Sequence, residues 1–422
     1  MTGITAGQVI VAPDKFRGSL TSPEVAAHVA AGLRTAVSGR VPVVRLPVAD
    51  GGDGTVDAVV ASGFTRVETE VTGPVGERVR AAYAVRDEPD GRVAVIELAE
   101  ASGLRRLPEG AAPEPLTATS RGTGELVAHA VRHGATRIVL GLGGSACTDG
   151  GAGLVRALGV RMLDAAGNDL PPGGAALRDL HAIDVSGRLR GFEVVVASDV
   201  DNPLLGPDGA AAVYGPQKGA TPGDVAVLEA GLARLAAVAA RTPGLVDDTA
   251  ERGGVASATD PAGRPGTGAA GGVGFGALTF LAATIRPGIG YLLDLVDFDR
   301  HVQGARLVIT GEGSIDEQTL RGKAPVGVAA AAARHGVPVV AVCGRRSVDD
   351  EELRAAGIEA AYALTEVEPD LRRCMAEAGP LLERLAGRIA AAFITPDSVA
   401  GPRELAGALG PGREQQSGDD HD

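Results

Sequence analysis

The three lysines of this chain all lie in glycine-containing stretches, although lysine and arginine together number 40 residues. They are Lys15 in PDKFRG, Lys218 in GPQKGA and Lys323 in LRGKAP. A lysine ammonium is a compact charge on a flexible stem that suits one phosphate oxygen, whereas arginine presents a broad planar fork. The alternative is that three lysines fell in loops by chance. The pattern predicts that these ammonium groups meet a phosphate or a carboxylate.

Two acidic loops offer oxygen ligands for a divalent cation. ADGGDGT carries Asp50 and Asp53 directly after an apolar stretch. TGEGSIDEQTLRGK carries Glu312 and Asp316 after the stretch RLVIT. Mg²⁺ in proteins is held by one or two carboxylates together with water and substrate phosphates, so these four side chains are the metal-ligating candidates. An Asx turn or a helix cap is the purely structural alternative for each loop.

A third loop, GLGGSACTDGGAG, begins at residue 141 and is rich in groups that bind an oxyanion. Its backbone N–H groups, the hydroxyls of Ser145 and Thr148 and the helix expected after it all suit a phosphate. The same loop spells GxGxxA over residues 141–146, and Asp164 ends a later apolar stretch. That spacing is typical of dinucleotide sites, so an NAD-dependent dehydrogenase of a small hydroxy acid is the alternative function.

Acid and base chemistry falls to carboxylates, because none of the seven histidines lies in these loops. The loop SDVDNP follows another apolar stretch and supplies Asp199 as the candidate base, with an Asx turn as its structural alternative. RGKA is not the end of a Walker A loop, since Ala324 stands where that motif needs Ser or Thr. Lysines, carboxylates and anion-binding loops without a nucleophile suit phosphoryl transfer, which needs positioning and charge neutralisation.

The elements that must position these loops alternate along the chain. Short apolar, β-branched stretches end in the glycine-containing turns, and amphipathic segments follow them, which is typical of parallel βα units. The expected strands span residues 9–12, 41–48, 137–142, 193–197, 307–310 and 337–342. The sequence therefore predicts an α/β fold.

Changes in the pattern of apolar and polar residues along the chain also predict two domains. Short alternating runs begin near Thr72, and plain βα alternation returns after residue 288. We expect residues 1–71 and 288–394 to form one discontinuous Rossmann-like domain of parallel strands, with residues 72–287 inserted as a second α/β domain. Residues 395–422 end in EQQSGDDHD and are too polar to repay the entropy of ordering, so they are expected to be a disordered tail.

Composition excludes several partners. The formal charge of −13 argues against nucleic acid, which normally requires a basic surface. Every long apolar stretch is broken by charged residues or proline, so no membrane span is expected. Three cysteines at no metal-ligand spacing fit a reducing compartment, and the N-terminal residues do not read as a signal peptide. We expect a cytoplasmic protein.

Taken together, five motifs resemble those of the bacterial type I glycerate kinases. They are APDKFRGSLTS, VADGGDGT, GLGGSACTDGGAGLVRALG, SDVDNPLLGPDGAAAVYGPQKGA and TGEGSIDEQTLRGKAPVGVA, and they occur in the family's order between residues 9 and 393. The resemblance implies a two-domain enzyme that transfers the γ-phosphate of ATP to D-glycerate and yields 2-phosphoglycerate. A sugar-acid-sensing module without catalysis is the remaining alternative.

These considerations give each candidate residue an expected role. Lys15 and Lys323 neutralise the transferred phosphate of ATP, the four carboxylates named above hold Mg²⁺, and Arg17 clamps the carboxylate of glycerate. The candidates for binding substrate or phosphate are Asp14, Arg17, Ser19, Gly143, Gly144, Ser145, Thr148, Asp149, Asn202, Gln217, Lys218, Gly311, Gly313 and Thr319.

Overall fold

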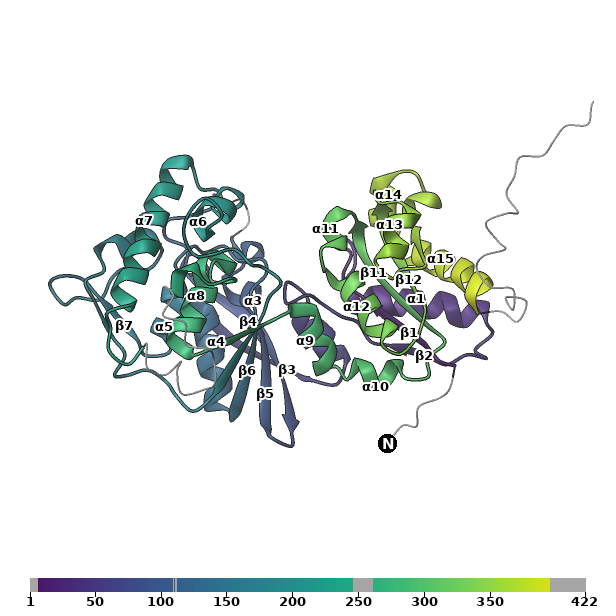
Figure 1. Ribbon diagram of the computed structural model, residues 1–422, viewed down its shortest axis with the longest axis horizontal. Coiled ribbons are helices and arrows are strands. Elements are labelled where there is room, and N and C mark those ends of the chain that lie inside the picture. Colours follow the sequence, from purple (N-terminus) through teal and green to yellow (C-terminus); the bar gives the residue numbers. More distant parts are fainter. Residues whose placement is uncertain (1–6, 109, 111, 246–260, 395–422) are drawn as a thin grey trace, which may run out of the picture.

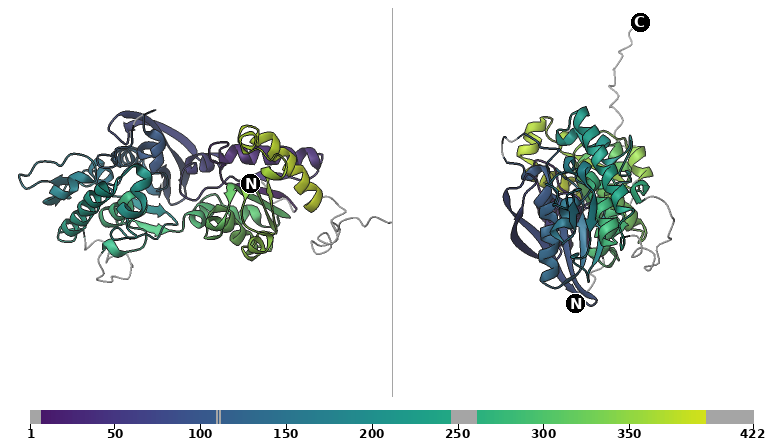
Figure 2. Two further views of the ribbon diagram at one scale, coloured as in Figure 1. Left: turned by 90° about the horizontal axis from the view of Figure 1, so that it is seen from above. Right: turned by 90° about the vertical axis from the view of Figure 1, so that its left-hand side faces the viewer.

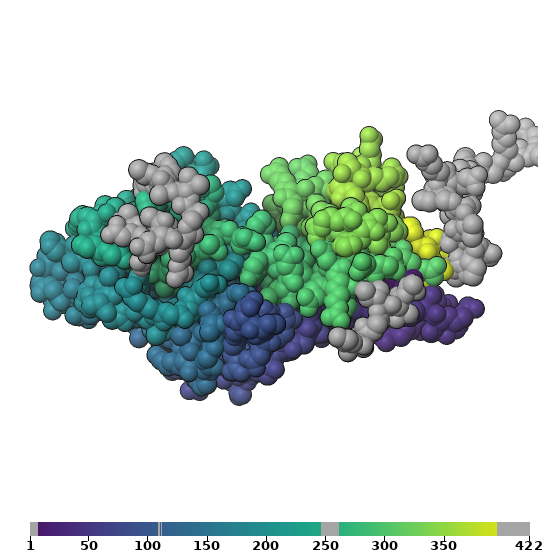
Figure 3. All heavy atoms as spheres, turned by 60° about the horizontal axis from the view of Figure 1, so that its bottom comes forward, coloured from purple at the N-terminus to yellow at the C-terminus, as the bar shows by residue number. Residues whose placement is uncertain are grey.

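The computed structural model describes residues 7–108, 110, 112–245 and 261–394. The molecule is elongated, with one large β-sheet in each half (Figures 1 and 2). The first and last described segments lie together at the same end, where the purple and yellow parts meet (Figure 3). The expected disordered tail, residues 395–422, lies outside the described residues.

The sheet at that end has five parallel strands in the order β13-β12-β11-β1-β2. The strands are β1 (Val9–Pro13), β2 (Val43–Arg45), β11 (Leu307–Ile315), β12 (Val339–Arg346) and β13 (Ala360–Ala363). β2 is shorter than the expected 41–48, although the backbone N–H groups of Leu46 and Val48 still donate to the carbonyl oxygens of Val11 and Pro13 in β1.

Helices cover both faces of this sheet, since side chains of a strand alternate between faces. Val9 and Val11 pack beneath α1 (Ser22–Ala36) and α15 (Ala378–Phe393). Ile10 and Ala12 belong to the core of the opposite face, with α10 (Phe298–Val302), α12 (Ala324–Ala333) and α13 (Asp350–Ala355). Chain connections therefore leave β1 and β11 toward opposite faces, which makes the gap between these two strands a topological switch point.

The second sheet has six strands in the order β10-β9-β6-β5-β4-β3 and is mixed. β3 (Thr65–Thr72), β4 (Arg78–Glu88) and β5 (Gly91–Glu97) are antiparallel neighbours, whereas β6 (Ala135–Gly141), β9 (Glu193–Ala197) and β10 (Thr284–Arg286) continue in parallel. A separate hairpin pairs β7 (Arg161–Leu163) with β8 (Ala182–Asp184). The α/β class expected from the sequence is confirmed.

One face of the six-stranded sheet is covered by helices of its own. They are α3 (Leu98–Ser102), α4 (Arg121–Arg132), α5 (Ala152–Ala157), α6 (Ala210–Tyr214), α7 (Pro222–Ala239) and α8 (Ala269–Leu281). Within the described part of the chain, none of the helices combines the length and apolarity that crossing a bilayer requires.

The other face of the six-stranded sheet shares a hydrophobic core with the five-stranded sheet. Val95 and Val139 from one sheet and Ile10 from the other belong to a single buried cluster, together with α2 (Thr55–Ala61) and α9 (Gly288–Leu295). Figure 1 shows α9 between the two sheets. The expected boundaries at residues 72 and 288 stay predictions, and β3, which precedes the first of them, pairs with β4 in the six-stranded sheet.

Candidate functional site

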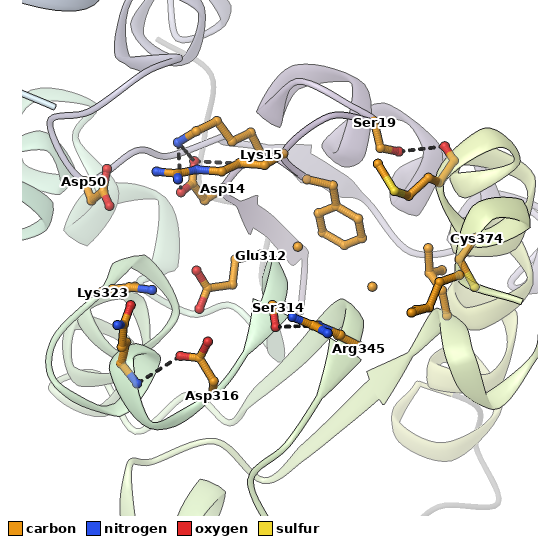
Figure 4. A pocket seen from close by; sticks show the side chains of 18 residues that line it. Asp14, Lys15, Ser19, Asp50, Glu312, Ser314, Asp316, Lys323, Arg345 and Cys374 are labelled. Carbon is orange, nitrogen blue, oxygen red and sulfur yellow. Dashed lines mark hydrogen bonds and ion pairs between the residues drawn. The ribbon is translucent and has the colours of Figure 1, made fainter. Parts of the chain in front are cut away.

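A cavity of about 590 Å³ opens where β1, β11 and β12 end, at the switch point of the five-stranded sheet. Carboxyl ends of parallel strands share one edge, so the loops that follow them meet there. Figure 4 shows that Lys15, Asp50, Glu312 and Lys323 surround one side of this cavity. Further lining residues are Asp14, Arg17, Ser19, Gly313 and Asp316.

Asp14 and Lys15 extend directly from β1 into the cavity. The Lys15 Nζ lies 3.4 Å from Oδ1 of Asp14, and the same oxygen accepts a 2.7 Å hydrogen bond from the Lys15 backbone N–H. The pKa of Asp14 is raised to about 6, mainly by burial; the charge of Lys15 opposes this rise and the charge of Asp50 adds to it. Asp14 is therefore a carboxyl group that exchanges its proton near neutral pH.

Glu312 ends the apolar part of β11 on the opposite side of the cavity. The hydroxyl of the buried Thr319 donates a hydrogen bond to it. Burial raises the pKa of Glu312 to about 6, and Lys323 is among the groups that lower it. Asp316 lines the same cavity but also caps α11 (Glu317–Leu320), accepting hydrogen bonds from the backbone of Gln318 and Thr319 at 2.9 and 3.2 Å.

The turn at residues 50–54 joins this cavity to the six-stranded sheet. Asp50 lines the cavity, and a Cβ on Gly51, whose φ is +86°, would lie 2.4 Å from the carbonyl oxygen of Ala197 at the end of β9. A Cβ on Gly143 would lie 2.4 Å from Cα of Gly52. Both contacts run backbone to backbone, so only glycine fits at these positions.

Asp53 is the residue of this turn with an unused polar atom. Its Oδ1 is buried without a hydrogen-bond partner, and its nearest cation is Arg105 Nε at 3.8 Å. A Cβ on Gly144 would lie 2.8 Å from the same oxygen. Ser145 follows Gly144 directly and pairs with Gly103 in a β-bridge. The turn and the 141–146 loop are thus in contact, and no space for a dinucleotide separates them.

Lys218 takes a place that its sequence context does not indicate. It is 2% exposed and does not line the cavity; its Nζ donates a 2.6 Å hydrogen bond to the carbonyl oxygen of Cys147. Burial lowers the pKa of Lys218 to about 8. The neighbouring Thr148 hydroxyl is buried without a hydrogen-bond partner in the described chain.

Several other expected site residues have structural partners outside the cavity. Asp149 accepts hydrogen bonds from the Ser120 backbone and hydroxyl at 2.8 and 2.9 Å. Asn202 is held by Asp208 and Tyr214. Gln217 and Gly311 do not line the cavity.

Asp199 does not line the cavity but lies beside Gly288, which also approaches the 50–54 turn. Its Oδ1 accepts a 2.8 Å hydrogen bond from the backbone N–H of Gly288, and a Cβ on Gly288 would touch both the Asp50 carbonyl oxygen and the Asp199 carboxylate. Burial raises the pKa of Asp199, and the negative charges of Asp50 and Asp201 add to this effect. Asp199 is thus close to the 50–54 turn.

Sequence reasoning missed two residues, Glu97 beside the 50–54 turn and Arg345 in the cavity lining. Glu97 ends β5, is 2% exposed and accepts hydrogen bonds from the backbone of Gly54 and Val56 at 3.1 and 2.5 Å, so it caps α2 from the other sheet. Burial raises the pKa of Glu97 to about 7, and Arg105 lowers it. The available signal for Glu97 was a charged residue at the end of the apolar stretch VAVIE. Arg345 lines the cavity and likewise follows an apolar stretch, VVAVCG.

The residues present fit a bound Mg²⁺. Across the described residues, no three His, Cys, Asp or Glu side chains gather closely enough to hold a metal ion alone. Mg²⁺ needs only one or two carboxylates when phosphates supply the other ligands. Asp50 and Glu312 face the cavity beside two lysines, and Asp53 keeps a buried oxygen unpaired.

Comparisons with known proteins show which family the chain belongs to. The model of the glycerate kinase family matches residues 9–394. A protein named glycerate kinase from Bacillus subtilis strain 168 is 44% identical over 390 residues, covering 92% of this chain and 97% of its own length. Glycerate 2-kinase from Escherichia coli K12 is 40% identical over 362 residues, covering 85% and 90%.

A solved structure also indicates the glycerate kinase family. The crystal structure of a protein from Salmonella typhimurium LT2, assigned as glycerate kinase 2, superposes with a TM-score of 0.76 at 41% identity and covers 92% of this chain and 98% of its own. These relationships favour a kinase over both the dehydrogenase and the sensing module. The chain belongs to the glycerate kinase family.

Proposed function

We propose that this kinase transfers the γ-phosphate of ATP to the 2-hydroxyl of D-glycerate, with Mg²⁺ bound, where the cavity meets the 50–54 turn between two domains. The observation that carries the proposal is the gathering of two of the three lysines and several carboxylates in one cavity. They come from the ends of separate strands and from the segments that follow them. The name of the Escherichia coli relative, glycerate 2-kinase, supports the choice of hydroxyl.

Lys15 and Lys323 are the proposed phosphate ligands. Both face the cavity beside acidic groups, so each ammonium can hold a phosphate oxygen while negative charge moves from the attacking hydroxyl to the leaving oxygen of ADP. Arg17, which is exposed at the cavity, is positioned to pair with the carboxylate of glycerate. Lys218 supports the 147–149 backbone from the interior.

Asp50, Asp53 and Glu312 would hold Mg²⁺. When bound, Mg²⁺ neutralises part of the charge on the β- and γ-phosphates. The raised pKa of Glu312 fits this role, because a partly buried carboxylate beside other carboxylates gains a compensating charge.

Asp199 is the proposed base for the hydroxyl of glycerate. Its pKa is raised by burial, which brings a carboxylate closer to the proton affinity that a base requires. Asp14 is the second candidate, because it lines the cavity and its pKa is raised to about 6. A cytoplasmic location completes the proposal, supported by three cysteines that are all free.

An assay for ADP release over small hydroxy acids tests the activity. D-glycerate should be phosphorylated in preference to glycolate and lactate. Coupling the product to enolase and pyruvate kinase alone should give a signal, because enolase accepts 2-phosphoglycerate but not 3-phosphoglycerate. A signal that appears only after a phosphoglycerate mutase is added would overturn the 2-hydroxyl assignment. Activity that survives EDTA would overturn the role of Mg²⁺.

A further inference from the structure

The cavity at the end of β1 has a second half whose chemistry the proposed transfer does not use. Its side chains are apolar, and we call them the apolar half: Phe16, Leu364, Leu371, Cys374 and Met375. Figure 4 shows Cys374 across the cavity from Asp50 and Lys323, so the charged and apolar groups occupy opposite sides. Glycerate is small and polar throughout, and it has no use for such a surface.

The apolar half has a buried floor and an exposed rim. Phe16, Leu364 and Cys374 are almost fully buried and belong to the core beneath α1 and α15. Leu371 and Met375 at the rim are 50% and 53% exposed, and they are two of only three large apolar side chains exposed in the described chain. Apolar side chains left exposed together at a cavity mark a binding surface.

The rim belongs to α14 (Leu371–Ala376), which is tied to the loop after β1. The hydroxyl of Ser19 donates a 3.0 Å hydrogen bond to the Met375 carbonyl oxygen, and a Cβ on Gly18 would lie 3.1 Å from Cε of Met375. The thiol of Cys374 donates to the Glu368 carbonyl oxygen at 2.9 Å. The apolar half is therefore held in place by the same loop that carries Lys15.

A polar group stands between the two halves. The Arg345 Nε donates a 3.2 Å hydrogen bond to the hydroxyl of Ser314, and both residues line the cavity. In Figure 4 they lie between Glu312 and Cys374. The charged end carries lysines together with carboxylates, so it suits an anionic group that brings a divalent cation. The middle suits a hydroxylated or anionic group, and the other end suits a flat or apolar one.

We propose that the apolar half binds the adenine ring of ATP, with the ribose beside Ser314 and Arg345 and the triphosphate extending to Lys15 and Lys323. The inference deepens the proposed kinase function and rests on it. Three observations carry it: the order of apolar, polar and charged groups along one cavity, the exposed rim, and a volume of about 590 Å³ that suits a nucleotide-sized ligand.

The test replaces the rim without adding charge. Leu371→Asn and Met375→Gln are tested singly and together. The double variant should raise KM for ATP about tenfold, because the adenine ring loses the apolar contacts that stabilise it when it leaves water. KM for glycerate should stay within about twofold of the parent. Val213→Asn is the matched control, since Val213 is the third exposed large apolar side chain and lies outside the cavity.

Calorimetry with two probes separates the base from the phosphates. Inorganic tripolyphosphate with Mg²⁺ should bind parent and double variant alike, whereas ATP with Mg²⁺ should lose about tenfold in affinity only in the double variant. Photolabelling of the parent by 8-azido-ATP should modify the peptide that contains residues 371–375.

The outcomes distinguish a failure of the adenine assignment from a failure of the proposed kinase function. A double variant that phosphorylates glycerate with an unchanged KM for ATP would overturn the adenine assignment and leave the kinase intact. A parent that releases no ADP with glycerate would overturn the proposed function, and the two-probe titration would still decide what the apolar half binds. Equal weakening of ATP and tripolyphosphate would also overturn the inference, since the rim would then act on the phosphates.

Discussion

Replacing Lys15 by alanine should lower kcat for glycerate phosphorylation by about 10² to 10³, which corresponds to about 2.7–4 kcal/mol of lost transition-state stabilisation. The estimate rests on geometry. The Lys15 side chain is 13% exposed and its Nζ lies 3.4 Å from Asp14, so its charge acts in a partly desolvated cavity and is screened less than a surface charge. The fold should survive, because no core cluster includes Lys15.

The assay is steady-state ADP release at saturating ATP and D-glycerate, with a thermal melt of each variant. Lys15→Arg is the matched control, since it keeps the charge but replaces the compact ammonium by a planar fork, and it should recover only part of the rate. A kcat for Lys15→Ala within about threefold of the parent, at an unchanged melting temperature, would refute the role of Lys15.

The same variant makes a second, independent prediction about pH. The pKa of Asp14 is raised to about 6, and Lys15 is the group that holds it from rising further. If the ionised carboxylate is required, kcat/KM rises with pH through this pKa in the parent. Loss of Lys15 should then move that acidic limb to higher pH. A limb at the same pH in parent and variant would show that Asp14 does not control activity.

Three further changes follow from the structure. Gly143→Ala places a Cβ 2.4 Å from Cα of Gly52, so urea unfolding should show a free energy of unfolding lower by about 1–3 kcal/mol. Gly290→Ala is the control: its Cβ meets nothing within 4 Å and it lies in α9, so the free energy of unfolding should stay the same or rise. Because burial lowers the pKa of Lys218 from 10.5 to about 8, the unfolded chain holds that proton between these pH values and the folded chain does not. The unfolding free energy should therefore rise over this range relative to Lys218→Met, and parallel curves would contradict the burial of a charge there. Glu312→Gln should raise the Mg²⁺ concentration for half-maximal rate about tenfold or more, and an unchanged requirement would remove Glu312 from the metal site.

Part of the site follows from sequence because parallel strands bring their ends to one edge. Lys15 and Asp50 follow strands, Glu312 lies near the end of β11, and Lys323 lies in the segment between α11 and α12 that follows this strand. The expected α/β pattern suffices to bring them to one edge of the sheet. The spacing of residues in the sequence does not determine, however, how the loops of one sheet pack against the other sheet. The 50–54 turn contacts the second sheet through backbone packing at Gly51 and through the Glu97 side chain, and neither contact is indicated by the sequence around the turn.

Other features were beyond sequence because burial depends on tertiary packing. The three lysines have similar neighbours in sequence, yet two face the cavity and Lys218 lies in the interior. Asp149 and Asn202 sit in loops that look like those of the site, but local hydrogen bonds use their polar atoms. The antiparallel pairing of β3 with β4 was likewise not anticipated. The boundaries at residues 72 and 288 stay predictions.

The contact between Gly52 and Gly143 also limits how this chain can diverge. Glycine is already the smallest residue, so a gain in size on one loop cannot be offset by a loss of size on the other. The rim residues Leu371 and Met375 are half-exposed and face no such limit. Single substitutions at these rim residues should therefore be enough to change the nucleotide preference of related sequences. A change in how the two sheets pack would instead require the backbone itself to move.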